Sequence, residues 1–177
     1  MTILSLRGKR SGPAVAWARI LVAVVMLATP VAALAAGPFA GLDGYWVGTG
    51  TVSLRSGTKE RMRCKAQYMV NPEGSNLQIS LTCDSDTYKF HVNSYANADN
   101  GSLTGNWSET TRNVSGGLSG RASPGKLQVR LNAGGQFGAS MAVTMKSNQM
   151  AVSVTPSGTS VASVSASLKK PWIFLHL

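Results

Sequence analysis

The sequence predicts an all-β protein whose strands, about 8–10 in number, form an antiparallel up-and-down meander that closes into a small barrel. Three observations support this fold class. After residue 43, apolar and polar residues alternate with a period of two, the repeat of a strand with one buried face. Turn-forming residues interrupt the alternation at short intervals. Glycine, at 19 of 177 residues, is abundant and favours turns over helices.

The alternation divides the chain into ten expected strands. The first half holds five of them, over 44–54, 60–70, 76–84, 87–96 and 102–109. Asn100-Gly101, between the fourth and the fifth, is a strong hairpin signal because this pair accepts positive φ. The second half holds five more, separated by turns rich in glycine, serine and asparagine, over 113–121, 126–132, 137–146, 149–155 and 161–168.

Closure into a barrel follows from the short connections. Strands joined by short turns tend to pair with their neighbours in sequence. A flat meander would leave two open edges and one bare apolar face, and a barrel removes both. A sandwich is the alternative, but it needs long crossover connections that are not evident. Glycines on one strand face permit bending, and they recur at Gly48, Gly50, Gly105, Gly116 and Gly120.

The first 35 residues have the pattern of a secretory signal peptide. A positively charged start with Arg7 and Arg10 precedes an apolar run over 20–28, and Ala33-Leu34-Ala35 matches a cleavage site. The apolar run is shorter than the ~20 residues of a helical membrane span, so an uncleaved anchor is the less favoured alternative. We expect a periplasmic or secreted protein with three parts: a signal peptide over 1–35, a barrel domain over 36–170 and a C-terminal tail over 171–177.

Cys64 and Cys83 are the two cysteines of the chain. In an oxidising compartment such a pair predicts one disulfide, with two buried free thiols as the alternative. Both share the parity of the apolar residues in their strands, and antiparallel pairing about the turn near 71–76 places them almost opposite each other. Closing this loop would contribute about 3 kcal/mol in the chain-entropy model.

The charge balance disfavours nucleic acid as a partner. The chain has 17 basic and 7 acidic residues, but four of the basic ones lie in the expected signal peptide. A net charge of +6 remains on the exported part. This excess is modest, and export separates the protein from nucleic acid.

Two short motifs resemble those of known barrels. Gly44-Tyr45-Trp46 resembles the G-x-W opening of the calycin-type barrels, which include lipocalins and avidins. Residues 101–107 resemble a glycine–leucine–threonine–glycine–aromatic strand of avidins. Exported bacterial protease inhibitors also form small barrels with one disulfide and an early tryptophan. The resemblance implies a small exported bacterial barrel of an uncharacterised family, and it carries over no ligand because the biotin-contacting set is missing.

Three aromatic and three basic side chains are candidates for binding. Trp46, Trp107 and Tyr68 would line a ligand cavity or, as the pattern favours, fill the core. The outward positions of the second strand form a candidate anion patch, to which Lys89 and Arg130 would add, at Arg61, Arg63 and Lys65. A solvated face that protects a strand edge is the alternative.

No set of nucleophile, base and oxyanion donors can be assembled from the sequence, and we expect no enzyme and no cofactor. His91 alternates with apolar neighbours and should face solvent. Ser56-Gly57-Thr58-Lys59 has the S-x-x-K spelling of penicillin-recognising enzymes but lies in an expected turn. Two cysteines and two histidines are too few for a zinc cluster.

These observations lead to a function class and not to a ligand. We expect an exported, non-enzymatic binding or envelope-associated protein whose partner is a small apolar ligand or another exported protein. One alternative is a barrel-type inhibitor of an exported protease or lysozyme. The other is a small outer-membrane barrel, although we expect no membrane span once the signal is cleaved.

Overall fold

The computed structural model describes residues 36–135 and 137–171, which form ten strands. The first five are β1 (Gly44–Leu54), β2 (Lys59–Val70), β3 (Asn76–Asp84), β4 (Lys89–Asp99) and β5 (Ser102–Glu109). The second five are β6 (Val114–Ser123), β7 (Lys126–Ala133), β8 (Phe137–Lys146), β9 (Gln149–Ser157) and β10 (Val161–Lys169). The expected signal peptide and residues 172–177 of the expected tail lie outside the described residues. No helix in the described part of the chain is long and apolar enough to cross a membrane.

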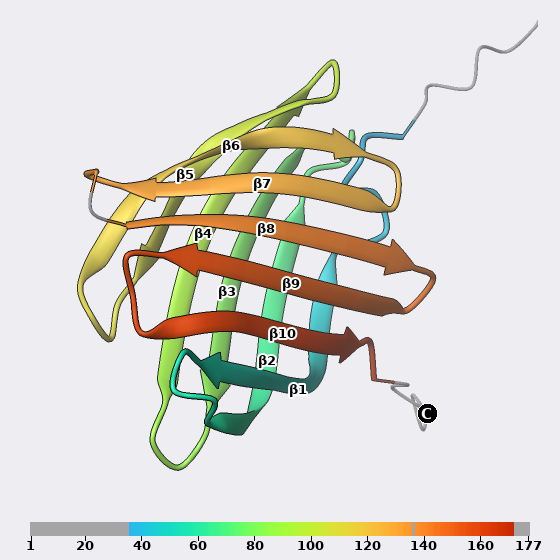
Figure 1. Cartoon of the computed structure of the whole chain (residues 1–177). Coiled ribbons are helices and arrows are strands. Elements are labelled where there is room, and N and C mark those ends of the chain that lie inside the picture. Colours follow the sequence, from blue (N-terminus) through green and yellow to red (C-terminus); the bar gives the residue numbers. More distant parts are fainter. Residues whose placement is uncertain (1–35, 136, 172–177) are drawn as a thin grey trace, which may run out of the picture. The chain divides into compact units, whose positions relative to one another are not determined.

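The ten strands form one closed antiparallel barrel in which each strand pairs with its sequence neighbours and β10 returns to pair with β1 (Figure 1). This confirms the predicted fold class. The expected bounds agree with the observed ones to within three residues, and the largest difference is at the end of β4, which continues to Asp99. The reason is the tight turn at Asn100 and Gly101, both at positive φ, which allows the ladder to run up to the turn itself.

The two faces of the barrel wall differ in polarity. On β2 the side chains of Met62, Cys64 and Ala66 are buried inside, and the residues between them are exposed. The other strands follow the same rule, with serine, threonine and charged residues on the outside. A barrel that spans a membrane needs the opposite arrangement, an apolar outer wall.

Glycine permits the strong curvature at places where neighbouring strands approach closely. A Cβ atom on Gly116 would stand 1.6 Å from the carbonyl oxygen of Asn132, and one on Gly105 would stand 2.0 Å from that of Tyr95. No side chain fits at these points, because the backbone of the adjacent strand occupies the space. The expectation that these glycines serve strand bending is therefore consistent with the structure.

The N-terminal segment 36–43 plugs one end of the barrel. Phe39 is fully buried there and Leu42 nearly so. The backbone of the segment is fixed to the β2–β3 turn, because the amides of Gly37 and Phe39 donate to the carbonyls of Glu73 and Gly74. In Figure 1 this segment, in blue, lies at the end toward which the arrowheads of β6, β8 and β10 point. We call this the plugged end, and the opposite one, which carries the β1–β2, β3–β4, β5–β6, β7–β8 and β9–β10 loops, the open end.

Cys64 on β2 and Cys83 on β3 form a disulfide. They are directly opposite each other in the antiparallel ladder, as the sequence pattern predicted. Both sulfur atoms are on the inner face, and both residues belong to the buried core. The bond thus ties two neighbouring strands from inside the barrel.

Candidate functional site

The candidate site consists of inward-facing side chains near the open end. Several inward-facing apolar side chains there are only partly buried, although strand alternation directs them into the lumen. They come mainly from β4 and from β7 to β10: Phe90, Val92, Leu131, Phe137, Met141, Val154, Val161 and Val164.

Two of the three candidate aromatic residues lie at the plugged end of the barrel. Trp46 is fully buried, and its indole N–H donates to the carbonyl of Leu42 at 2.8 Å. The ring of Tyr68 packs edge-on against it at 6.1 Å between centroids. The Tyr68 hydroxyl donates to the sulfur of Met150 at 3.3 Å, and burial raises the pKa of this phenol to about 12. These contacts make Trp46 and Tyr68 core residues at the floor of the barrel.

Trp107, the third candidate, lies closer to the open end. It is largely buried, and its indole N–H donates to the carbonyl of Gly117 at 3.2 Å. Its ring lies 5.5 Å from that of Phe137, which is itself only half-buried. Trp107 and Phe137 therefore form an aromatic pair on the inner wall near the open end.

A buried carboxylate organises one side of the rim. Glu109 ends β5, and its two oxygens accept hydrogen bonds from the amides of His91, Thr111 and Arg112 and from the Thr111 hydroxyl. Burial raises the pKa of Glu109, but these hydrogen bonds outweigh it and hold the pKa below its ordinary value. The role of Glu109 is not evident from the sequence, because an acidic residue beside a turn is usually solvated.

Two arginines fasten the loops around the opening. The guanidinium of Arg112 lies 4.7 Å from the centre of the Phe90 ring and donates to the carbonyl of Lys89 at 3.0 Å. Phe90 in turn stacks on Tyr88 with 6.1 Å between ring centres. Across the opening, Arg55 donates to the carbonyl of Thr159 at 3.0 Å. Both arginines are thus engaged in loop contacts.

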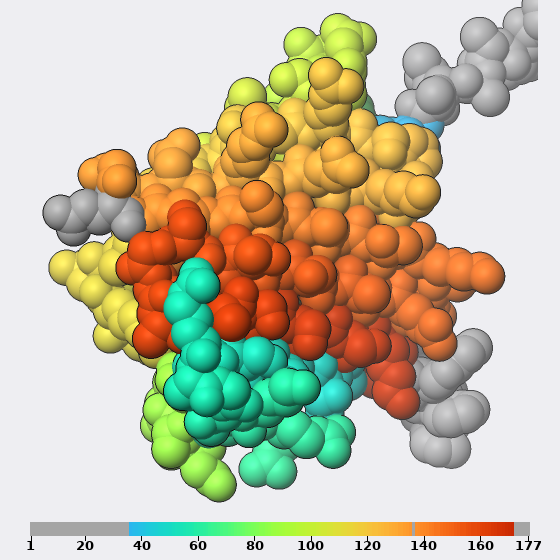
Figure 2. All heavy atoms as spheres, in the orientation of Figure 1, coloured from blue at the N-terminus to red at the C-terminus, as the bar shows by residue number. Residues whose placement is uncertain are grey.

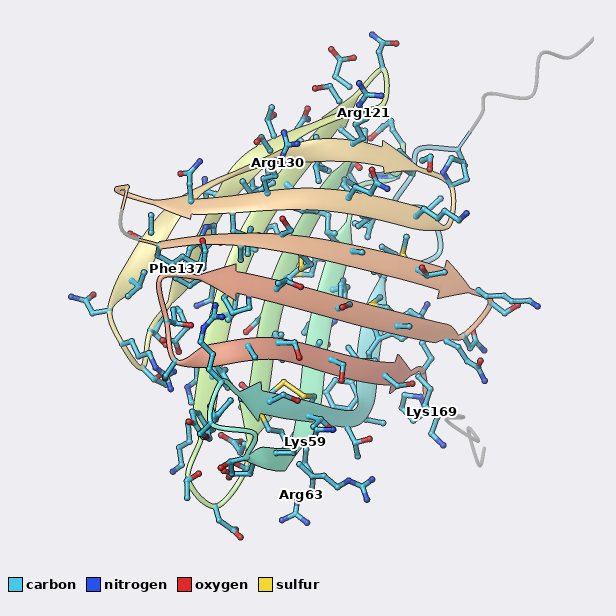
Figure 3. All side chains as sticks on the ribbon, in the orientation of Figure 1. Lys59, Arg63, Arg121, Arg130, Phe137 and Lys169 are labelled. Carbon is cyan, nitrogen blue, oxygen red and sulfur yellow. A yellow bond between two sulfur atoms is a disulfide. The ribbon has the colours of Figure 1, made fainter. Side chains whose placement is uncertain are left out.

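The candidate anion patch lies on the outer face of β2, where Arg61, Arg63 and Lys65 are exposed at alternate positions. Figure 3 shows Arg63 directed away from the barrel. The ion pairs in the described part of the chain are His91–Asp84 and Arg112–Glu109, so these three cations have no carboxylate partner there.

The expectation that Arg130 extends this patch is wrong. Arg130 is on β7, which is five strands from β2 in either direction around the closed ring. The sequence shows that a residue faces outward, but the position of its strand around the barrel depends on closure. Arg130 therefore belongs to the opposite wall.

His91 is exposed, as expected, and its Nε2 lies 3.7 Å from Asp84. The residues Ser56 to Thr58 are in the β1–β2 turn, where the two hydroxyls contact each other. Among the described residues, no group of three histidine, cysteine or acidic side chains is placed to hold a metal ion.

The fold defines a class, the closed ten-stranded antiparallel barrel, and solved structures resemble it. Rv2717c from M. tuberculosis matches with a TM-score of 0.60 and 9% identity, over 75% of this chain and 94% of that one. A DUF3598-family protein of unknown function from Nostoc punctiforme matches with a TM-score of 0.54 and 12% identity, over 74% of this chain and 48% of its own. This chain thus spans about half the length of the Nostoc protein. No protein-family model and no curated protein matches the sequence.

Proposed function

We propose that the protein is an exported, calycin-like barrel that binds a small apolar ligand in its interior and catalyses no reaction. One observation carries the proposal: apolar side chains directed into the lumen stay partly exposed at the open end, while the plugged end is sealed by Phe39 and Trp46. A concave apolar site with few polar groups is the usual form of a small-molecule pocket. The polar outer wall supports a barrel in water over one in a membrane, and the disulfide is compatible with export.

The test uses the uncharged dye N-phenylnaphthylamine as a fluorescent apolar probe of the chain from residue 36 onward. Val164→Trp places a large ring in the lumen, since Val164 faces inward and pairs with Val52 and Val154. Ser165→Trp adds the same ring to the outside of the same strand and serves as the control.

We expect Val164→Trp to weaken dye binding by about tenfold or more, because the added ring fills space that the ligand needs. Ser165→Trp should bind like the unmodified protein, and circular dichroism should show that both variants are folded. Equal binding by the two variants, or no dye binding by the unmodified protein, would refute the proposal.

A further inference from the structure

The positive charge of the protein is concentrated in the second half of the barrel. All seven acidic residues lie between positions 43 and 109, together with six basic ones of the exported part. From residue 110 onward there are seven basic residues and no acidic one. The excess charge of the exported chain therefore belongs to the β5–β6 loop, to β6–β10 and to their connections.

Two arginines of this half stand side by side with free guanidinium groups. Arg121 on β6 pairs with Gln128 on β7, and Arg130 is two residues farther along β7 on the same outer face. Such diagonal neighbours are about 7–8 Å apart. Figure 3 shows both on the outer wall. Among the described residues neither has an ion pair or a side-chain hydrogen bond, in contrast to Arg55 and Arg112.

A groove on the outer wall contains these two arginines. It consists of two adjoining hollows of about 640 and 530 Å³ that share Gly120, Arg121 and Gln128. The first hollow extends to the β4–β5 turn and includes Lys126, and the second extends across β8 to Thr155 on β9. Figure 2 shows part of this wall, with β7 to β9 facing the viewer in orange. The groove thus crosses five strands, a distance of about 19 Å at the usual strand spacing.

Hydroxyl and amide groups make up most of the remaining polar lining. They come from Asn100, Ser102, Ser119, Ser123, Ser140 and Ser153. No acidic side chain lines either hollow. The closest by strand register is Asp99, which pairs with Ser102 and accepts a hydrogen bond from Asn100. The large apolar residues that are most exposed, Tyr45, Met69 and Tyr95, are on β1, β2 and β4, away from the groove.

We propose that this groove binds an anionic glycan chain, a function separate from ligand binding in the lumen. The planar guanidinium groups of Arg121 and Arg130 match the oxygens of a sulfate, phosphate or carboxylate substituent. The hydroxyl and amide side chains along the groove complement sugar hydroxyls. A lone ion would leave most of the length empty, and a flat membrane cannot follow a groove. A protein partner would be expected to use exposed aromatic or methionine side chains, which this wall lacks.

The test compares two double variants that remove the same charge from opposite walls. Arg121→Gln with Arg130→Gln removes both guanidinium groups from the groove. Arg61→Gln with Arg63→Gln makes the same change on β2 and is the matched control. Binding of a sulfated and of a carboxylated oligosaccharide is measured by calorimetry at fixed salt, with a neutral oligosaccharide of equal length and a polyglutamate peptide as further probes.

We expect the groove variant to lose about tenfold or more in affinity for at least one anionic oligosaccharide, because it removes the charged hydrogen bonds that the two guanidinium groups would donate to the anionic substituents. The β2 variant should stay within about twofold of the unmodified protein, and the neutral sugar should not bind. Equal losses in both variants would show that binding follows net charge alone and would overturn the proposal. Absence of binding to both anionic sugars would overturn it, and so would polyglutamate binding with the same dependence on Arg121 and Arg130.

Failure of this proposal and failure of lumen binding are distinguishable. The groove variant changes only the outer wall, so it should bind N-phenylnaphthylamine as the unmodified protein does. Val164→Trp changes only the lumen and should leave the affinity for the anionic oligosaccharide unchanged.

Discussion

The two halves of the barrel, β1 to β5 and β6 to β10, differ in their side chains. In β1 to β5 the core contains large, fully buried side chains such as Trp46, Met62 and Leu77, and the disulfide joins two of the strands. In β6 to β10 the core also contains buried residues such as Met150 and Leu168, but several inward residues, Met141 and Val154 among them, are only partly buried, and no carboxylate is present. Both halves have the same antiparallel strand pairing, and they differ in cross-linking, in side-chain burial and in charge.

This difference separates stability from access. The disulfide makes the first half costly to open, whereas the second half has no disulfide and no carboxylate to balance the arginines on its outer wall. Binding surfaces are expected where the structure retains incompletely satisfied groups. The comparison therefore predicts that equivalent substitutions in the two halves have unequal effects.

Leucine truncation gives the largest expected contrast. Leu77→Ala in the first half should cost about 3 kcal/mol of unfolding free energy, because Leu77 is only 2% exposed and the cavity cannot collapse fully. Leu131→Ala in the second half makes the same chemical change at an inward but half-buried site and should cost about 1–2 kcal/mol. Urea denaturation measures both, and equal costs would contradict the distinction between the halves.

Removal of the disulfide should have an effect of similar size. Cys64→Ser with Cys83→Ser releases a loop between residues 19 positions apart, which should cost about 3 kcal/mol. The paired positions are both buried, so the serine hydroxyls add a further small cost. The double variant Cys64→Ala with Cys83→Ala lacks these hydroxyls, so it measures the cost of losing the bond without the cost of burying polar groups. Unchanged stability of the alanine pair relative to the oxidised protein would show that the bond does not support the first half.

The barrel could be predicted from the sequence because the features that specify it lie within short segments of the chain. Strict alternation on β2 and the turn at Asn100-Gly101 specify strands and hairpins within a few residues, and neighbour pairing then places Cys64 opposite Cys83. The same alternation predicted which residues face outward. The meander needs no long-range information except the final pairing of β1 with β10.

What the sequence did not predict depends on closure and curvature. The prediction that Arg130 lies beside the β2 cations is wrong, because the position of a strand around the ring is known only when the ring closes. The groove near Arg121 is formed by five neighbouring strands together. The alternation of residues within one strand therefore does not predict it. One signal was nevertheless present: counting charges separately for the two halves would have shown that the second half has no acid.

Glu109 connects the two halves, and its substitution should have an intermediate effect. Glu109→Gln keeps the shape but weakens the bonds to the amides of His91 and Arg112, and should cost about 2 kcal/mol near neutral pH. The pKa of Glu109 is lowered in the folded state, so its contribution is complete above the ordinary carboxyl value of 4.5 and is lost as the pH falls through the folded pKa. Denaturation at a series of acidic pH values should therefore show the difference between the two proteins shrinking on acidification. A constant difference would contradict this role.

The smallest effect is expected at Tyr68, whose hydroxyl crosses from β2 in the first half to Met150 on β9 in the second. Tyr68→Phe should cost about 1 kcal/mol at pH 8, because a neutral hydrogen bond to sulfur is weak. Burial raises the pKa of this phenol to about 12, above the value near 10 of an unfolded tyrosine. The folded state then holds the proton longer than the unfolded chain does, and the unmodified protein loses stability as the pH rises from about 10 toward 12. Tyr68→Phe removes this loss, so the stability difference between the two proteins should narrow at alkaline pH and reverse if ionisation outweighs the bond. An identical alkaline slope in both proteins would show that Tyr68 is not the group that couples the halves to pH.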